Sequence, residues 1–285
     1  MKLKELLTRA QNEGFAIGAF NASDLVTIRA IAQAAKNLNA PVIIETSPGE
    51  TDFLGLKNLS CLIRNYQKEG NLIFANLDHA ESEEIIEEAV ESGFNMVHFD
   101  GSKMELEENI AQSLQVVGLA HQKGILVEGE IDHIEGHSQK NLQTAESLQK
   151  TSGYTNPEKA VVFVKETGVD ILAVAIGNLH GVFQTEEKID LERLRNIREN
   201  LSCFFSLHGS SGIVEEEIRK AIQIGKIVKI NVNTDLRLAY RRALDAVIGE
   251  SEEVVPYKLF APVVEAVQKV VEEKIRLFGS EGKVK

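Results

Sequence analysis

The chain has 285 residues, 43% of them hydrophobic, and its formal net charge is -12. That length suits one α/β barrel, and the apolar fraction is enough to fill a large core. An acidic surface disfavours nucleic acid and anionic membranes as partners, because phosphate binding needs clustered Lys and Arg, whereas a small anionic substrate needs only a local site.

The N-terminal stretch and the two cysteines indicate a cytoplasmic protein. Residues 1–14 have the pattern of an amphipathic helix and lack the apolar centre of a signal peptide. No apolar run approaches the roughly 18 residues that a membrane span requires. Cys61 and Cys203 lack the spacing of a zinc knuckle or a disulfide framework, which favours reduced thiols.

Short apolar runs recur along the chain with helix-length segments between them. They are rich in Val, Ile and Phe without strict alternation, which is typical of strands buried on both faces. Eight such runs predict strands at residues 15–20, 40–46, 71–78, 96–101, 125–131, 169–177, 203–209 and 227–232. The pattern predicts a (β/α)8 TIM barrel forming one domain, residues 1–285. An open doubly wound sheet is the alternative, disfavoured because no GxGxxG follows the first run.

Two segments break this repeat. Residues 132–156 are polar and too long for an ordinary connection, and loops of this length are usually functional or mobile. Residues 261–279 have the pattern of an extra amphipathic C-terminal helix. Its apolar stripe packs either on the same barrel or against another subunit, and comprises Val263, Val264, Val267, Val270 and Val271.

Polar residues gather where the predicted strands end, which is where barrels of this kind carry their chemistry. Three histidines follow the third, sixth and seventh strands, and acids lie near them; the set comprises Asp78, His79, Asp100, Glu128, Glu130, His180 and His208. Imidazoles with carboxylates nearby suit Zn²⁺ or a similar first-row ion, and three protein ligands leave a position open for substrate. His98, inside the fourth strand, is expected to be structural, while His133 and His137 on the long segment stay open.

Small residues after the last two strands indicate an anion site. "HGSSG" (208–212) and "NVNTD" (231–235) each open a predicted helix, where backbone N–H groups can approach an anion. Loops after the seventh and eighth strands are the usual phosphate site of this fold. Asn231, Asn233 and Thr234 therefore belong to a candidate site for a phosphorylated substrate.

An ordered set of motifs spans nearly the whole chain. It comprises "GAFN" (18–21), "LDH" (77–79), "EENI" (107–110), "VEGEI" (127–131), "TGVDILAVAIGNLHG" (167–181), "LHGSSGI" (207–213), "KINVNT" (229–234) and "KIRLFGS" (274–280). The chain resembles the class II, metal-dependent ketose-bisphosphate aldolases of the fructose- and tagatose-1,6-bisphosphate type. The resemblance implies zinc-dependent, reversible cleavage of a phosphorylated ketose into dihydroxyacetone phosphate and an aldehyde, by a homodimer or homotetramer.

The resemblance also implies roles for individual residues. His79, His180 and His208 match the zinc ligands, and Asp78 matches the general acid/base that moves the proton of the C4 hydroxyl. Asp100 and Glu130 match acids near an alternative position for the metal or a second or monovalent cation. The residues matching those that hold the dihydroxyacetone-phosphate half are Gly181, Gly209, Ser210, Ser211, Asn231 and Thr234, and those lining the pocket are Asn21 and Ser47.

Several positions depart from the family pattern. Ser138 stands where a loop acid is usual, and Glu135 or His137 could replace it. Gln184 replaces a Lys, Ser210 replaces a Gly, and residues 260–267 lack an Arg that can reach a neighbouring subunit's substrate. These departures leave fewer cationic side chains to bind phosphate. They leave two alternatives open: an aldolase for a less phosphorylated sugar, and a sugar-phosphate-binding protein without turnover.

Overall fold

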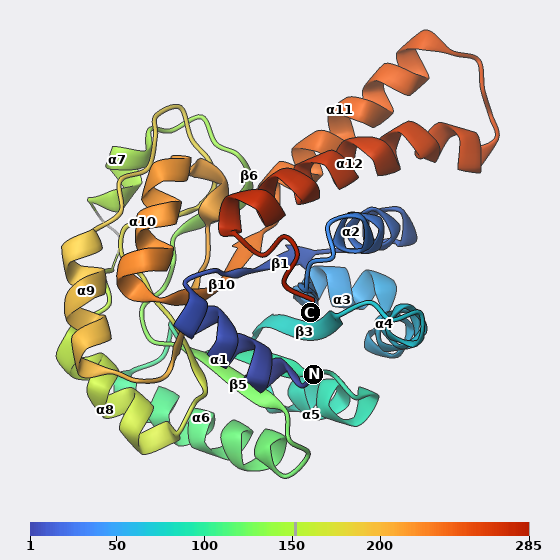
Figure 1. The fold of residues 1–285 in the computed structure, drawn as a ribbon. Helices are drawn as coiled ribbons and strands as arrows, with labels where there is room; N and C mark the ends of the chain where they lie inside the picture. Colours follow the sequence, from blue (N-terminus) through green and yellow to red (C-terminus); the bar gives the residue numbers. More distant parts are fainter. Residues whose placement is uncertain (151–152, 285) are drawn as a thin grey trace.

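The computed structural model describes residues 1–150 and 153–284, and eight of its strands close into a parallel barrel (Figure 1). Around the barrel the order is β1-β10-β9-β7-β5-β4-β3-β2. The strands are β1 (Ile17–Asn21), β2 (Val42–Thr46), β3 (Ile73–Ala80), β4 (Met96–Asp100), β5 (Leu126–Glu130), β7 (Ile171–Ala173), β9 (Phe204–Leu207) and β10 (Ile227–Val232). The predicted (β/α)8 barrel is confirmed, and each predicted strand segment overlaps one of these strands, with β1 and β3 extending beyond the predicted ends.

Helices surround the barrel because every strand is buried on both faces (Figure 1). They are α2 (Leu25–Asn37), α3 (Pro48–Leu54), α4 (Leu56–Lys68), α5 (Glu83–Ser92), α6 (Leu106–His121), α8 (Pro157–Thr167), α9 (Leu191–Asn200) and α10 (Glu215–Gly225). Several of them follow the sequence signals for helix ends: Asp24 caps α2 by accepting from the Thr27 N–H, and α5 ends at Gly93 with φ 81°.

The first helix, α1 (Leu3–Glu13), closes the N-terminal end of the barrel. Its buried residues Leu3, Leu6, Leu7 and Ala10 recur at helical spacing. They share one apolar cluster with residues at the starts of the strands, among them Ile17, Phe74, Met96, Leu126 and Phe204. Since this end is filled with apolar side chains, the C-terminal end is left for polar chemistry.

The sixth barrel strand is shorter than predicted. β7 ends at Ala173, and the chain then leaves the barrel before His180 begins β8 (His180–Val182). β8 pairs in parallel with β6 (Gly136–Lys140), which lies in the long 132–156 segment together with α7 (Ala145–Gln149). Gly181 has φ 122°, and a Cβ there would collide with the His137 carbonyl oxygen, so only glycine permits this approach. The pairing fastens the long segment over the barrel mouth.

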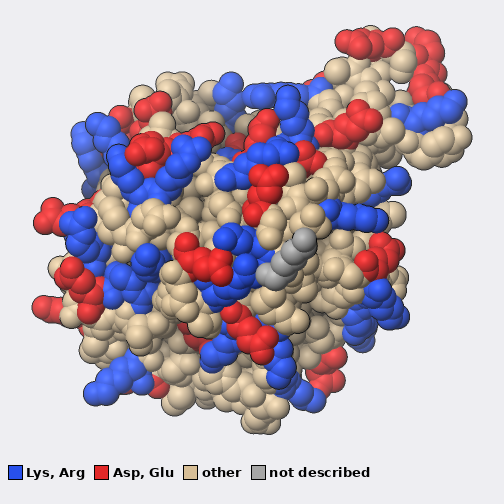
Figure 2. Space-filling model, viewed as in Figure 1, with Lys and Arg blue, Asp and Glu red and all other residues tan. Residues whose placement is uncertain are grey.

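Two long antiparallel helices, α11 (Thr234–Glu250) and α12 (Pro256–Phe278), project from one side of the barrel (Figure 1). The predicted C-terminal helix is confirmed and begins at Pro256, earlier than expected. Its residues Val263, Val267, Val271 and Ile275 are buried within this chain, where α12 packs against α2. Acidic side chains gather at the tip of the projection (Figure 2). Within residues 1–150 and 153–284, no helix is long and apolar enough to cross a membrane.

Val267→Ala should lower the free energy of unfolding by about 2 kcal/mol, because the buried side chain loses two methyl groups and leaves a cavity against α2. Val254→Ala is the matched control, since Val254 is 80% exposed and should change stability by less than about 0.5 kcal/mol. Urea denaturation of both variants measures the difference. Equal stability would show that the stripe on α12 contributes little to the packing of the folded chain.

Candidate active site

A cavity of about 370 Å³ lies at the C-terminal end of the barrel. It is lined by most of the residues predicted from the sequence: Asn21, Ser47, Asp78, His79, Asp100, His180, Gly181, Gly209, Ser210, Ser211, Asn231, Asn233 and Thr234. Glu130 and His208, the other predicted site residues, are fully buried and contact His79 from below the lining. The structure therefore brings the predicted site residues to one place.

A backbone irregularity at the end of β3 turns Asp78 and His79 toward the same cavity. Neighbouring residues of a regular strand point to opposite faces. Here the register with β4 shifts between Leu77 and Ala80, and His79 takes a left-handed conformation with φ 50°. A bulge of this kind re-aims side chains, and a non-glycine residue in that region costs of order 1–3 kcal/mol. The strain is located at the one dipeptide that supplies both an acid and an imidazole.

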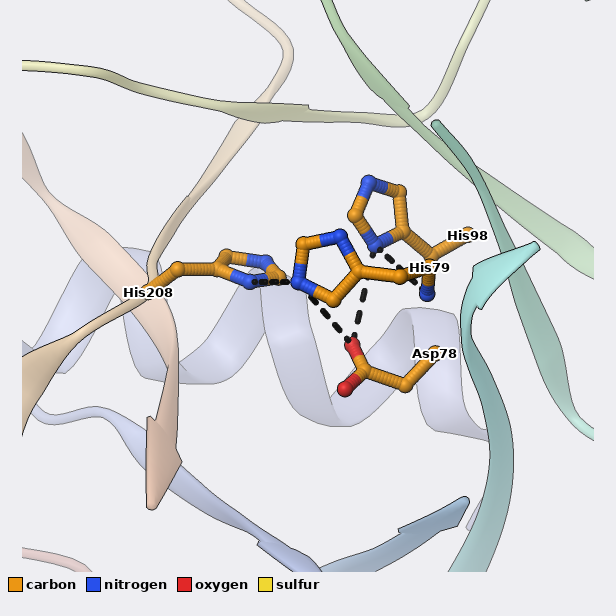
Figure 3. A group of neighbouring side chains, drawn as sticks. All are labelled: Asp78, His79, His98 and His208. Atoms are coloured by element: carbon orange, nitrogen blue, oxygen red, sulfur yellow. Dashed lines mark hydrogen bonds and ion pairs between the residues drawn. The ribbon is translucent and has the colours of Figure 1, made fainter. Parts of the chain in front are cut away.

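The imidazoles of His79, His180 and His208 converge although they come from different strands. The ring centroid of His79 lies 4.8 Å from that of His208 and 5.2 Å from that of His180. The His180 and His208 centroids are 6.0 Å apart. Figure 3 shows the His79 ring with its Nε2 facing His208 Nδ1, 3.1 Å away. His180 lies on β8 and not on a barrel strand, yet its side chain lies where the sequence predicted.

In each of these rings one nitrogen, the outer nitrogen, contacts a hydrogen-bond acceptor, and the other is the inner nitrogen. His79 Nδ1 lies 2.7 Å from Asp100 Oδ2, and His208 Nε2 lies 2.8 Å from Glu128 Oε1. His180 Nδ1 lies 3.0 Å from the Ile134 carbonyl oxygen, which can only accept. A proton on the outer nitrogen of a neutral ring leaves its inner nitrogen with a lone pair, and His79 reaches that state once Nε2 gives up the proton that it can donate to His208 Nδ1. This is the arrangement in which second partners orient imidazoles for a metal.

A fourth histidine, His98 on β4, belongs to the same group although it was expected to be only structural. Its ring centroid is 4.6 Å from that of His79, and its Nδ1 lies 3.6 Å from Asp78 Oδ1 (Figure 3). Ligand atoms of Asp78, His79, His98 and His208 all lie within 4.8 Å of one another. His180 lies beside this group. The sequence could have indicated this position, because side chains alternate along a strand and His98 therefore shares the inner face of β4 with Asp100.

The same alternation fills the barrel interior with charge directly below the cavity. Lys229 on β10 is fully buried and its Nζ lies 2.9 Å from Glu128 Oε2 and 3.4 Å from Glu45 Oε2. Burial alone would lower the pKa of Lys229, but Glu128 and Glu45 raise it. Lys229 Nζ also donates to Asn231 Oδ1, and Asn231 Nδ2 then faces Asp78 Oδ1 at 3.1 Å. Lys229 therefore fixes which end of the Asn231 amide points at Asp78.

The donor set fits a divalent cation. Burial would lower the pKa of His79, but Asp78 and Asp100 raise it to about 9, so the surrounding acids favour positive charge at this ring. Burial, with His79 and His208 nearby, lowers the pKa of His180 to about 3 and keeps that ring neutral. A second candidate group of ligand atoms comprises His79, Asp100 and Glu130. Neutral imidazoles bordered by carboxylates are ligands that first-row metals prefer.

The segment over the mouth contributes side chains that the sequence left open. His133, His137 and Ser138 line the cavity, whereas Glu135 lines a neighbouring hollow with Asp132. Among the described residues of that segment, His133 and His137 are thus the titratable groups that reach the cavity. Ser210 also lines it, but its hydroxyl donates to the Asn231 carbonyl oxygen at 2.6 Å, so its backbone is what it can offer a ligand.

Arg237 and Glu50 also belong to this region, and no sequence signal singled them out. Arg237 lies on the first turn of α11 and lines the cavity. Its Nη2 donates to Glu50 Oε1 at 2.7 Å, and its Nη1 donates to the Ser138 carbonyl oxygen at 3.1 Å. A lone arginine in a helical pattern reads as a surface residue, so only the position of α11 at the cavity rim reveals it.

A closed β/α barrel with converging histidines, a buried aspartate and a polar mouth defines the class of metal-dependent aldolases. The chain belongs to the class-II fructose-bisphosphate aldolase family, whose model matches residues 1–283. It is therefore an aldolase, a carbon–carbon lyase of a metal-dependent class that acts on a phosphorylated sugar.

Individual relatives agree with this membership over their whole lengths. A fructose-bisphosphate aldolase of Staphylococcus aureus (strain Mu50 / ATCC 700699) is 33% identical over 290 residues, which cover 100% of this chain and 99% of the relative. The crystal structure of the YdjI aldolase from Escherichia coli K12 is 31% identical, with a TM-score of 0.85 over 100% of this chain and 99% of that one. A putative fructose-1,6-biphosphate aldolase from Coccidioides immitis is 30% identical, with a TM-score of 0.85 over 99% and 98% of the two chains.

If His79, His180 and His208 hold Zn²⁺, the affinity for this ion should rise with pH below about pH 9. The pKa of His79 is raised to about 9, so at lower pH its inner nitrogen holds a proton that the metal must displace. His180 and His208, whose pKa values are lowered, release none. Between pH 6 and 8 we expect about one proton released per metal and about a tenfold gain in affinity per pH unit. Calorimetry in buffers of different ionisation enthalpy counts the protons, and a pH-independent affinity would contradict this assignment.

Proposed function

We propose that this chain is a zinc-dependent aldolase that reversibly cleaves a phosphorylated ketose of the fructose or tagatose type. The products are dihydroxyacetone phosphate and an aldehyde. The observation that carries the proposal is the pairing of Asp78 with three converging imidazoles in a polar cavity, where His79 Nε2 faces His208 Nδ1 and the His180 ring lies beside them. These groups come from the ends of β3 and β9 and from β8, as expected for chemistry at the C-terminal end of a barrel.

In this proposal His79, His180 and His208 hold the metal. Bound Zn²⁺ supplies Lewis-acid chemistry, polarising the ketose carbonyl so that negative charge can develop beside it. Asp100 contributes through the His79 ring, which it orients at 2.7 Å, and Glu130 lies 3.8 Å from the same nitrogen. These two acids are our candidates for a second or monovalent cation.

Asp78 is proposed to take the proton of the C4 hydroxyl during cleavage and to return it during condensation. Burial would raise the pKa of Asp78, but His79, His98 and His208 lower it well below its usual range, so the carboxylate is ionised near neutral pH. Asn21 Nδ2 and Asn231 Nδ2, each 3.1 Å away, hold its two oxygens in place. A positioned and ionised carboxylate is what a general base requires.

The phosphate of the dihydroxyacetone half is proposed to bind between the ends of β9 and β10. Gly209 has φ 63°, and a Cβ there would collide with the Leu179 carbonyl oxygen, so only glycine lets the loop after β9 approach the segment before β8. The N-terminus of α11 begins beside them at Asn233 and Thr234, where free N–H groups and the helix dipole favour an anion. Gly181, Ser210 and Ser211 complete this wall.

The wider setting is part of the same proposal. We propose that residues 1–285 act as one catalytic domain in the cytoplasm, where the free thiols of Cys61 and Cys203 are stable. We also propose a homodimer or homotetramer, which the resemblance to the family suggests. Val263, Val267 and Val271 of the stripe on α12 do not supply that contact, because they are buried within the chain.

Asp78→Asn should reduce kcat for retro-aldol cleavage by about 10²–10⁴-fold, because the amide cannot accept the hydroxyl proton. Asp245→Asn is the matched control on the exposed surface of α11 and should keep the wild-type rate. Complete metal removal should abolish turnover in the wild type, and Zn²⁺ should restore it. Full activity of the Asp78 variant or of the metal-stripped protein would refute the mechanism. Binding of dihydroxyacetone phosphate without turnover would favour the non-catalytic alternative.

A further inference from the structure

The wall of the cavity formed by β1 and β2 is occupied by an internal carboxylate, that of Glu50. Glu50 is buried, and its Oε2 accepts from Ser47 N (2.9 Å), Ser47 Oγ (2.9 Å) and Asn21 Nδ2 (3.0 Å). Its Oε1 accepts from Arg237 Nη2 at 2.7 Å. The polar donors that this wall could offer to a bound anion are therefore already directed at a negative charge of the protein itself.

A capping role explains only part of this arrangement. Glu50 is the third residue of α3 and forms a capping box with Ser47, which any glutamate at that place can do. Asn21 from β1 and Arg237 from α11 are not part of such a cap, yet both reach the same carboxylate. Asn21 also donates to Asp78 Oδ2, so Glu50 is one amide group away from the proposed base. The carboxylate thus lies directly behind the lining of the reaction cavity, bonded to Asn21 and Arg237, which line it.

A second cavity of about 410 Å³ adjoins this wall, and the Glu50–Arg237 pair lies between the two. It is lined by Asn21, Ser23, Asp24, Thr27, Glu50, Phe53, Asn233, Leu236, Arg237 and Tyr240. Among the described residues that line the two cavities, Arg237 is the one Lys or Arg, and Glu50 already neutralises it. Asp78 and Asp100 line the first cavity, and Asp24 and Glu50 line the second, so both cavities carry negative charge. The surroundings favour a neutral, partly apolar group over an anion.

We infer that Glu50 selects for a substrate phosphorylated at one end only, so that the aldehyde product is uncharged and rich in hydroxyl groups. This inference rests on the proposed function and deepens it by naming the substrate class. With the phosphate of the dihydroxyacetone half between β9 and β10 and the reacting bond at Asp78, the aldehyde half extends toward Asn21, Ser47 and Glu50. Hydroxyl groups can donate to Glu50 there, whereas a phosphate would have to compete with the Glu50 carboxylate for Arg237.

Condensation of dihydroxyacetone phosphate with glyceraldehyde or with glyceraldehyde 3-phosphate tests this, because the two acceptors differ by one phosphate. The wild type should show the higher kcat/KM with glyceraldehyde. Glu50→Gln, which keeps the size and removes the charge, should shift the ratio of the two kcat/KM values toward the phosphorylated acceptor by about tenfold or more. Glu50→Asp keeps the charge and should stay on the wild-type side of that ratio.

Two further measurements separate charge from shape. Glu265→Gln on the exposed face of α12 is a matched control that should leave the ratio unchanged. Raising the salt concentration should improve the wild-type rate with glyceraldehyde 3-phosphate more than that of Glu50→Gln, since screening weakens the unfavourable effect of the Glu50 charge and leaves any steric effect unchanged. Thermal unfolding of each variant confirms that it is folded.

The outcomes distinguish failure of the inference from failure of the proposed function. Wild-type preference for the phosphorylated acceptor would overturn the inference and assign Arg237 as a phosphate ligand, and an unchanged ratio in Glu50→Gln would overturn the role of Glu50. Both results would leave the aldolase activity standing. No condensation with either acceptor, in zinc-loaded protein that binds dihydroxyacetone phosphate, would overturn the proposed function and the inference with it.

Discussion

The ion pair between Lys229 and Glu128, buried inside the barrel, is the interaction on which the site depends. Glu128 fixes the ring of His208, and Lys229 fixes the amide of Asn231, which in turn holds Asp78. A buried pair of this kind adds little net stability, but removing one partner leaves an unpaired charge that costs about 3–5 kcal/mol. The pair matters for geometry, because it orients His208 on one wall and, through Asn231, Asp78 on the opposite wall.

This charged centre is possible because the two ends of the barrel are filled differently. At the N-terminal end α1 and the first residues of the strands form an apolar plug. Above it the inward-facing residues are Glu45, His98, Glu128, Ser206 and Lys229, all fully buried. Buried polar groups are tolerated only when they find partners. Their contacts run continuously upward to the cavity, so the polar interior and the site form one network.

The site also depends on contacts between segments that are distant along the chain. The pairing of β6 with β8 brings the 132–156 segment over the mouth and orients His180 through the Ile134 carbonyl oxygen. Across the cavity, Arg237 on α11 reaches both Glu50 and Ser138. The rim is therefore joined by these contacts, and the charge of Glu50 makes one side of the cavity unsuited to anions.

The sequence by itself determined the barrel, its strand segments and most lining residues of the cavity. It could do so because strand burial and strand ends are local patterns, and a closed parallel barrel brings all C-terminal strand ends together. It did not determine the short β7, the bulge at His79, the membership of His98, or the pairing of Glu50 with Arg237. Tertiary structure decided these, because each depends on residues far apart in the chain competing for the same few hydrogen-bonding partners and the same space.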